Sequence, residues 1–208
     1  MRVIAVLNQK GGSGKTTIAT HLARSFHLSG DSVILVDSDP QGSARDWAAA
    51  NKNQLFSVIG LDRPTIERDI KSLAKTDWVV IDGAPQAANL AISAIKSADL
   101  VLIPVQPSPY DIWATSDLVD LVKERIAMTE GRLKAVFVVS RAIAGTKLGL
   151  EVAEALHGYD LPVLASKIMQ RVVYPSSAAN GMTAFDSANL DAISDFVHLR
   201  NEITLLMK

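Results

Sequence analysis

The sequence contains no cysteine, and this absence excludes several classes of site. The chain can form no disulfide, thiolate metal centre or iron–sulfur cluster, and it has no cysteine nucleophile. Long hydrophobic runs are also missing, because no stretch reaches the roughly 18–20 uncharged apolar residues that span a bilayer. The N-terminal run Met1–Leu7 is too short for the core of a signal peptide. We therefore expect a soluble, cytoplasmic protein.

An excess of charge of either sign is absent as well. The chain has 21 Lys and Arg residues against 22 Asp and Glu residues, which gives a formal net charge of −1. This balance argues against a nucleic-acid binder that is basic throughout, although it leaves room for a local basic patch. The four histidines show no spacing typical of a metal site, so we expect them to be structural.

Hydrophobic residues make up 48% of the 208 residues, which is enough for a sizeable core. Short runs rich in Val and Ile alternate with segments of helical spacing. We predict strands at Val3–Leu7, Ser32–Val36, Trp78–Ile81, Leu100–Val105 and Lys134–Val139. We predict helices at Lys15–Ser29, Ser43–Asn51, Thr65–Leu73, Asn89–Ser97, Ile112–Met128, Leu148–Leu156 and Asp191–Leu206. The alternation predicts a single α/β domain over residues 1–208, with a mostly parallel, twisted sheet, helices on both faces, and ligand sites at the carboxyl ends of the strands.

A glycine-rich loop follows the first strand and opens the first helix; it reads Gly11-Gly12-Ser13-Gly14-Lys15-Thr16-Thr17. This context is typical of a phosphate-binding loop, in which backbone N–H groups face phosphate oxygens and no Cβ atom obstructs them. Lys15 would meet the β- and γ-phosphates, Thr16 a Mg²⁺ ion and Thr17 the α-phosphate. The dinucleotide fingerprint does not fit, because it requires glycine where Thr17 stands.

One departure from the ordinary phosphate loop is informative. Gln9 stands where the first glycine is usual, and Lys10 follows it. The run Lys10-Gly-Gly-Ser-Gly-Lys-Thr-Thr resembles the deviant phosphate loop of the ParA/MinD family of ATPases. The resemblance implies a P-loop three-layer sandwich, ATP and Mg²⁺ as cofactors, and a nucleotide-sandwich dimer in which Lys10 reaches the phosphates bound by the other copy. Such a lysine would act in hydrolysis as a cation supplied in trans, much as an arginine finger does.

Three aspartates follow predicted strands and complete the nucleotide motifs. Asp37 and Asp39 lie two residues apart, so an extended chain points both the same way. By resemblance to the family, Asp39 positions or deprotonates the attacking water, and Asp37 and Asp82 hold the Mg²⁺ shell. Asp37 or Asp39 could instead cap the helix that follows. Gly83 stands where many relatives have threonine, and its N–H group could take over the contact with the γ-phosphate.

The resemblance covers nearly the whole chain and is greatest to the small, ParF-like plasmid partition ATPases, which have no helix-turn-helix extension before the first strand. Three further segments match this subgroup: Asp82–Ala84, Pro104–Pro109 and Gln170–Tyr174. The resemblance places Pro107 of the proline-rich segment and Arg141 near the adenine, and Arg141 could stack on the ring.

The same resemblance implies partners. The ATP-bound form would associate with itself as a dimer or a larger assembly and bind DNA without sequence preference, which would place the protein on the nucleoid. A ribbon-helix-helix protein that reads the centromere would stimulate hydrolysis. Candidate DNA contacts in the C-terminal half are Arg132, Lys134, Lys147, Lys167, Arg171 and Arg200.

Two other functions stay open on the sequence alone. The same switch could position a protein or membrane cargo, as MinD-type relatives do with a basic amphipathic C-terminal helix. Here the helix Asp191–Leu206 mixes acids and bases, so we expect it to pack on the sheet and expect no membrane partner. The second alternative is a small-molecule enzyme of the dethiobiotin-synthetase type, which needs no lysine in trans, so Lys10 argues against it.

Overall fold

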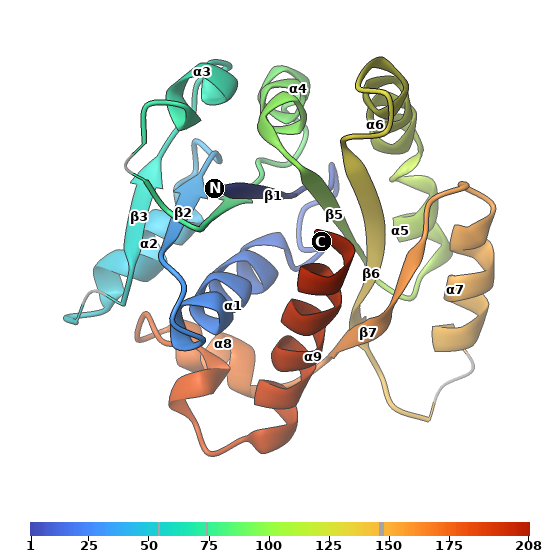
Figure 1. Ribbon diagram of the computed structural model, residues 1–208. Helices are drawn as coiled ribbons and strands as arrows, with labels where there is room; N and C mark the ends of the chain where they lie inside the picture. Colours follow the sequence, from blue (N-terminus) through green and yellow to red (C-terminus); the bar gives the residue numbers. More distant parts are fainter. Residues whose placement is uncertain (54, 74, 146–147) are drawn as a thin grey trace.

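One parallel sheet forms the centre of the protein (Figure 1). The computed structural model describes residues 1–53, 55–73, 75–145 and 148–208. Its strands are β1 (Arg2–Val6), β2 (Val33–Asp37), β3 (Ser57–Gly60), β4 (Trp78–Asp82), β5 (Leu100–Val105), β6 (Lys134–Ala142) and β7 (Val163–Met169). Their order across the sheet is β3-β2-β4-β1-β5-β6-β7, and every neighbouring pair is parallel. This arrangement confirms the predicted fold class.

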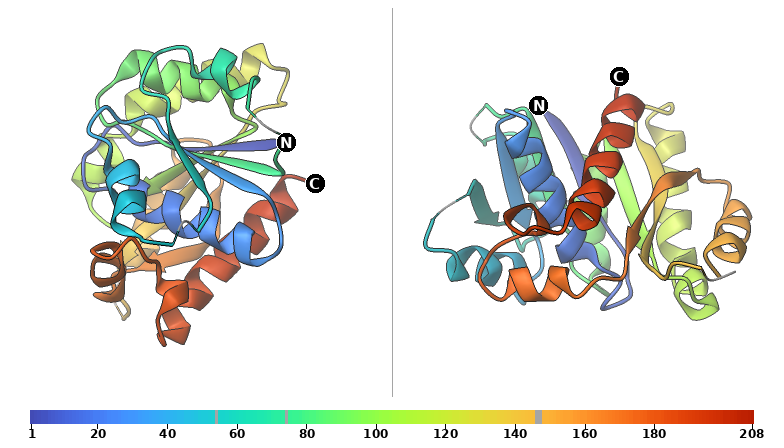
Figure 2. Two further views of the ribbon diagram at one scale, coloured as in Figure 1. Left: turned by 90° about the vertical axis from the view of Figure 1, so that its left-hand side faces the viewer. Right: turned by 90° about the horizontal axis from the view of Figure 1, so that it is seen from below.

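Helices cover both faces of the sheet, as predicted (Figure 2). They are α1 (Lys15–Leu28), α2 (Ser43–Ala50), α3 (Ile66–Ile70), α4 (Ala88–Ser97), α5 (Pro109–Trp113), α6 (Ser116–Met128), α7 (Leu148–His157), α8 (Val173–Ala178), the 3-10 helix η1 (Ala184–Asp186) and α9 (Leu190–Leu206). One face carries α3, α4, α6 and α7, and the other carries α1, α2, α8 and α9. Within the described ranges, no helix is long and apolar enough to span a bilayer.

The central strands are buried because their side chains alternate between the two layers of helices. On β1, Val3 and Ala5 join the apolar cluster beneath α4 and α6, whereas Ile4 and Val6 join the cluster around α1 and α9. A strand that is covered on both faces needs apolar residues at every position. This requirement explains why these strands stand out in the sequence as short, continuous apolar runs.

The sequence prediction missed β3, β7 and α8, and it merged two helices into one. The predicted helix Ile112–Met128 is interrupted after Trp113, and α6 begins at Ser116. Thr115 is buried at the break, where its hydroxyl donates to the carbonyl oxygen of Ile112 at 2.6 Å. A side-chain hydrogen bond of this kind competes with helix continuation. The strand β7 was missed because its run carries Ser166 and Lys167 and lies at the half-exposed edge of the sheet.

The register of the sheet gathers three strand ends at one point. Val6 on β1 pairs with Asp82 on β4, and Asp82 pairs in turn with Asp37 on β2. The loop that follows β1 therefore lies next to both acids, at the carboxyl edge where ligands bind in sheets of this type.

Candidate functional site

The loop between β1 and α1 is shaped by its glycines. Gly12 and Gly14 have φ angles of 76° and 95°, a conformation that other residues rarely adopt. A Cβ atom at Gly14 would also lie 2.6 Å from the hydroxyl oxygen of Ser140 on β6. Gln106, after β5, donates from Nε2 to the carbonyl oxygen of Gly12 at 2.8 Å and steadies the loop. Among the described residues no side chain caps α1, so the first N–H groups of this helix are available to an anion.

Lys15, the first residue of α1, brings a buried positive charge to this loop. Its Nζ donates to the carbonyl oxygen of Lys10 at 3.0 Å. Burial lowers the pKa of Lys15, while the negative charges of Asp82 and Asp39 act in the opposite direction. The hydroxyl of Ser13 is buried nearby and has no hydrogen-bond partner among the described residues. A buried cation, an unpartnered hydroxyl and a free helix N-terminus together suit a phosphate group.

Lys10 is paired within its own chain. Its Nζ lies 2.6 Å from Oδ2 of Asp111 on α5, and the Asp111 side chain is 5% exposed against 38% for that of Lys10. The other oxygen of Asp111 has no hydrogen-bond partner in the described part of the chain. Sequence reasoning missed this pair, since the two residues lie 101 positions apart and nothing marks an acid on a short helix as a partner for the loop.

Asp82 is a buried carboxylate without hydrogen-bond partners. The residue is 1% exposed, and neither of its oxygens is bonded within the described ranges. Burial raises the pKa of Asp82 to about 7; the Thr16 hydroxyl lowers it, and the charge of Asp37 raises it. A buried carboxylate in this state is stabilised by a cation, and the oxygen atoms of Asp82 and Thr16 suit Mg²⁺.

The described residues contain no group of three or more His, Cys, Asp or Glu that could enclose a metal ion. A Mg²⁺ ion in a nucleotide site does not need such a group, because one or two protein groups hold it together with phosphates and water. The unpartnered oxygens of Asp82, with the nearby Thr16, fit the predicted metal.

Asp37 lies beside Asp82, but both of its oxygens are engaged. Oδ1 accepts from the N–H of Asp39 at 3.0 Å, and Oδ2 accepts from the N–H of Arg45 at 2.9 Å. The guanidinium Nε of Arg45 lies 3.4 Å from the same Oδ2. The carboxylate therefore shapes the turn from β2 into α2, which is the capping role that the sequence left open. A place for Asp37 in the metal shell stays a prediction.

Asp39 and Gly83 follow the two acids Asp37 and Asp82 in the chain. Asp39 is half-buried, and its Oδ1 accepts from the N–H of Gln41 at 2.9 Å; in the described part of the chain no hydrogen bond reaches its Oδ2. At Gly83, a Cβ atom would lie 2.4 Å from Cδ2 of Leu7 and 2.8 Å from the carbonyl oxygen of Val6. The N–H of Gly83 donates to that same carbonyl at 3.1 Å, so it is not free for the expected γ-phosphate contact.

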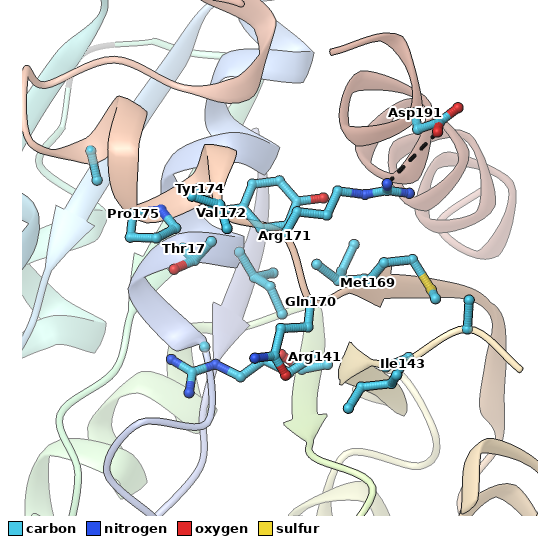
Figure 3. A pocket seen from close by; sticks show the side chains of 17 residues that line it. Thr17, Arg141, Ile143, Met169, Gln170, Arg171, Val172, Tyr174, Pro175 and Asp191 are labelled. Carbon is cyan, nitrogen blue, oxygen red and sulfur yellow. Dashed lines mark ion pairs between the residues drawn. The ribbon is translucent and has the colours of Figure 1, made fainter. Parts of the chain in front are cut away.

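A cavity of about 880 Å³ opens beside the loop, between β6, β7 and α8 (Figure 3). Gly14 and Thr17 line one end and connect the cavity to the phosphate loop. Arg141 lines it as well, from an exposed position at a bulge of β6 where its φ is 53°. Pro107 is half-buried before α5 and is not among the described residues that line the cavity. The volume is in the range of a pocket for a nucleoside.

One wall of this cavity is fixed from α9. The Oδ2 of Asp195 accepts from Nε of Arg171 at 3.0 Å, from Oη of Tyr174 at 2.9 Å and from the N–H of Met169 at 3.2 Å. Burial, and next the charge of Asp195, raise the pKa of Tyr174, so its hydroxyl remains a donor. Sequence reasoning gave these residues no role in the site, because an acid on an amphipathic helix ordinarily faces solvent.

Several of the predicted DNA contacts form ion pairs or hydrogen bonds within the chain. Arg171 forms ion pairs with two carboxylates of α9. Lys134 and Arg200 each donate to a backbone carbonyl oxygen. Lys147 lies outside the described residues. The location of a DNA-binding surface therefore stays a prediction.

Comparisons with known proteins agree with this geometry. The family described as "CobQ/CobB/MinD/ParA nucleotide binding domain" matches residues 4–184. The maintenance of carboxysome distribution protein A of Halothiobacillus neapolitanus is 29% identical over 96% of this chain and 95% of its own length. The chromosome partitioning protein ParA of Myxococcus xanthus is 30% identical over 76% of this chain and 71% of its own.

Solved structures share the fold. Apo McdA of Cyanothece matches with a TM-score of 0.78 and 16% identity, over 98% of this chain and 99% of that one. The septum site-determining protein MinD of Pyrococcus horikoshii, complexed with Mg-ADP, matches with a TM-score of 0.75 and 21% identity, over 99% and 96%. The chain therefore belongs to the CobQ/CobB/MinD/ParA nucleotide-binding family and is a ParA/MinD-type ATPase.

Proposed function

We propose that this chain is an ATP-dependent dimerising switch that partitions plasmid DNA. The observation that carries the proposal is Lys10, a second lysine beside a phosphate-binding loop, which is paired at 2.6 Å with the buried carboxylate of Asp111. In a monomeric P-loop enzyme such a lysine would only neutralise Asp111, whereas in two copies that close over bound ATP it can also contact the phosphates of the other copy.

The phosphate end of the site supplies the chemistry of hydrolysis. Lys15 and the N-terminus of α1 bind the β- and γ-phosphates, and Asp82 and Thr16 hold the magnesium ion. Mg²⁺, when bound, neutralises the charge that develops on the phosphates. Asp39, which has a free oxygen, orients the attacking water or accepts its proton. The base of ATP occupies the cavity that Arg141 lines.

Lys10 changes partner when the dimer forms. In the single chain its ammonium group neutralises the buried Asp111; in the dimer it contacts the phosphates bound by the second copy. When Lys10 leaves Asp111, the buried carboxylate keeps a negative charge without a partner, which is unfavourable. The γ-phosphate of ATP provides the additional negative charge that offsets this cost, so ADP does not support the dimer.

The dimer then acts through partners. In the ATP state it binds DNA without sequence preference through basic residues, which retains it on the nucleoid. A centromere-binding protein of ribbon-helix-helix type stimulates hydrolysis and returns the chain to the monomer.

Self-association tests the proposal directly. We would measure molar mass by light scattering with ATP and Mg²⁺, with ADP and Mg²⁺, and without nucleotide. Wild-type protein is expected to dimerise, or to form larger species, only with ATP. Lys10→Ala is expected to remain monomeric while it still binds ATP.

Lys123→Ala provides a matched control, because Lys123 has the same 38% side-chain exposure as Lys10 and pairs with Asp160 at 3.1 Å. It should dimerise like wild type. A wild-type protein that binds ATP and stays monomeric at every concentration would refute the switch and favour a small-molecule enzyme.

A second candidate cargo is a protein body, because the relative that spans 96% of this chain is named for the distribution of carboxysomes. The two cargoes are separated by deleting the gene in its natural host. Plasmid partition predicts that a plasmid is lost more often per generation, with protein bodies still evenly spaced. Positioning of a protein body predicts the reverse.

A further inference from the structure

Asp195 on α9 binds the wall of the cavity between β7 and α8 at three residues. Its carboxylate accepts hydrogen bonds from the backbone of Met169 and from the side chains of Arg171 and Tyr174. Asp191 on the same helix also pairs with Arg171, with its Oδ2 3.8 Å from Nη1. The side chains of Arg171 and Tyr174 line the cavity, and Figure 3 shows them on the same wall. Asp195 itself is not among the described lining residues, so its influence on a ligand passes through the residues that it holds.

The Tyr174 ring is fixed by packing as well. It meets the ring of His21 on α1 edge-on with centroids 5.2 Å apart, and that of Phe196 on α9 with centroids 5.6 Å apart. Since α1 also carries the phosphate-binding residues at its N-terminus, Tyr174 lies between the phosphate helix and α9. A shift of Tyr174 or Arg171 would change the shape of the cavity without touching the loop.

We propose that Asp195 is a positioning residue of the nucleotide site, which sets the wall against the base through Arg171 and Tyr174. This inference rests on the proposed function, because it assumes that the base occupies this cavity. The phosphates bind at the other end, to groups that Asp195 does not contact. Loss of Asp195 therefore weakens the binding of a nucleotide and leaves the binding of phosphates alone unchanged.

The chain offers a matched control on the same helix. Glu202 accepts from the N–H groups of Ala165 and Ser166 at 2.8 and 2.9 Å, so it also ties α9 to β7. None of these three residues is among those described as lining the cavity. Asp195→Asn and Glu202→Gln thus each remove one carboxylate between α9 and β7, and only the first lies behind the cavity wall.

The experiment measures the dissociation constants of ATP and of inorganic tripolyphosphate, both with Mg²⁺, together with unfolding in urea. For Asp195→Asn we expect ATP to bind about tenfold more weakly, the effect of losing a charge-assisted hydrogen bond, and tripolyphosphate to bind as in wild type. Glu202→Gln should bind both ligands as wild type does, although both variants unfold at lower urea concentration.

The inference is overturned if the two variants weaken ATP equally, or if Asp195→Asn weakens ATP and tripolyphosphate alike. If Asp195→Asn does not fold, Tyr174→Phe tests the inference instead. This variant removes the hydrogen bond from Tyr174 to Asp195 with little change in the shape of the side chain. It should weaken ATP, by about threefold, and spare tripolyphosphate. A wild-type protein that binds neither ligand would instead refute the proposed function.

Discussion

The phosphate end and the base end of the candidate site are built in different ways. At the phosphate end, the functional groups are backbone N–H groups and single side chains at the ends of neighbouring strands. Their positions follow from Gly14 and from the register that pairs Asp37 with Asp82. At the base end, the site is a cavity between β6, β7 and α8 whose wall depends on Asp195, far along the chain. A site made by the backbone can be located from a short motif, and a site made by packing cannot.

The two ends also differ in how well their polar groups are satisfied. At the phosphate end, Asp82 and Ser13 are buried without hydrogen-bond partners in the described part of the chain. At the base end, the carboxylate of Asp195 accepts several hydrogen bonds from the wall that it supports. Unsatisfied groups gain most from a ligand, whereas satisfied groups hold the scaffold rigid. Substitutions at the first end should therefore alter hydrolysis or the effect of Mg²⁺ on binding, and those at the second end should alter stability or the affinity for the base.

The largest effect is expected for Asp39→Ala at the phosphate end. If Asp39 orients or deprotonates the attacking water, its loss should slow ATP hydrolysis by about a thousandfold. ATP binding should change little, because no phosphate contact is assigned to this side chain. Phosphate release under single-turnover conditions measures the rate, and isothermal calorimetry measures binding.

Asp46→Ala is a suitable control for Asp39→Ala, since Asp46 is an exposed acid in the first turn of α2. Hydrolysis that persists in Asp39→Ala at the rate of this control would show that another group handles the water.

The base end should respond to pH through His21, whose ring packs edge-on against that of Tyr174 in the cavity wall. The Nε2 of His21 accepts from the N–H of Ala184 at 3.0 Å, and its Nδ1 lies 2.8 Å from the carbonyl oxygen of Thr17. Burial lowers the pKa of His21 from 6.5 to about 4, against the Thr17 carbonyl and the charge of Asp186, which raise it. Between pH 4 and 6.5 the unfolded chain binds a proton at His21 that the folded chain does not. The contribution of neutral His21 to the free energy of unfolding is therefore complete above pH 6.5 and is lost as pH falls toward 4.

The shift corresponds to about 3 kcal/mol of free energy of unfolding. Urea denaturation at several pH values, without nucleotide, should therefore show that His21→Asn loses less stability on acidification than wild type. Equal losses in the two proteins would mean that His21 titrates alike in the folded and unfolded chains.

The difference between the phosphate end and the base end also explains which parts of the molecule can be predicted from the sequence. The central strands were found because burial on both faces demands continuous apolar runs, as in Val79–Ile81 on β4. The phosphate loop was found because Gly14 and Lys15 stand in a fixed order between a strand and a helix. The strand β7 was not found, since an edge strand tolerates residues such as Lys167.

The contacts that sequence reasoning missed join residues far apart in the chain. The pair of Lys10 and Asp111 joins the phosphate loop to α5, and the hydrogen bond from Tyr174 to Asp195 joins α8 to α9, so both depend on the way in which separate elements pack. Arg141 was anticipated from a family resemblance, and its position beside the cavity comes from a bulge that no local pattern marks.

Asp82→Asn tests the unsatisfied group of the phosphate end. The amide keeps the size of the carboxylate but loses its charge, so Mg²⁺ should no longer tighten ATP binding. We expect a loss of about tenfold in affinity with Mg²⁺ and little change in the presence of EDTA. Binding titrations with and without the metal measure both values. A variant whose affinity still rises with Mg²⁺ as in wild type would remove Asp82 from the metal shell.

Among Asp39→Ala, His21→Asn, Asp82→Asn and Arg141→Ala, the last gives the smallest expected effect, and it tests whether the base end binds a base. A guanidinium group stacked on an adenine ring contributes modestly, so the variant should bind ATP about fivefold more weakly. Inorganic tripolyphosphate should bind as in wild type, because the phosphate loop is intact. Were Arg141 instead to contact the phosphates by charge alone, both ligands would lose affinity together, and added salt would reduce the difference from wild type. Competition experiments with the two ligands at low and high salt therefore distinguish stacking from charge at the end of the site that is made by packing.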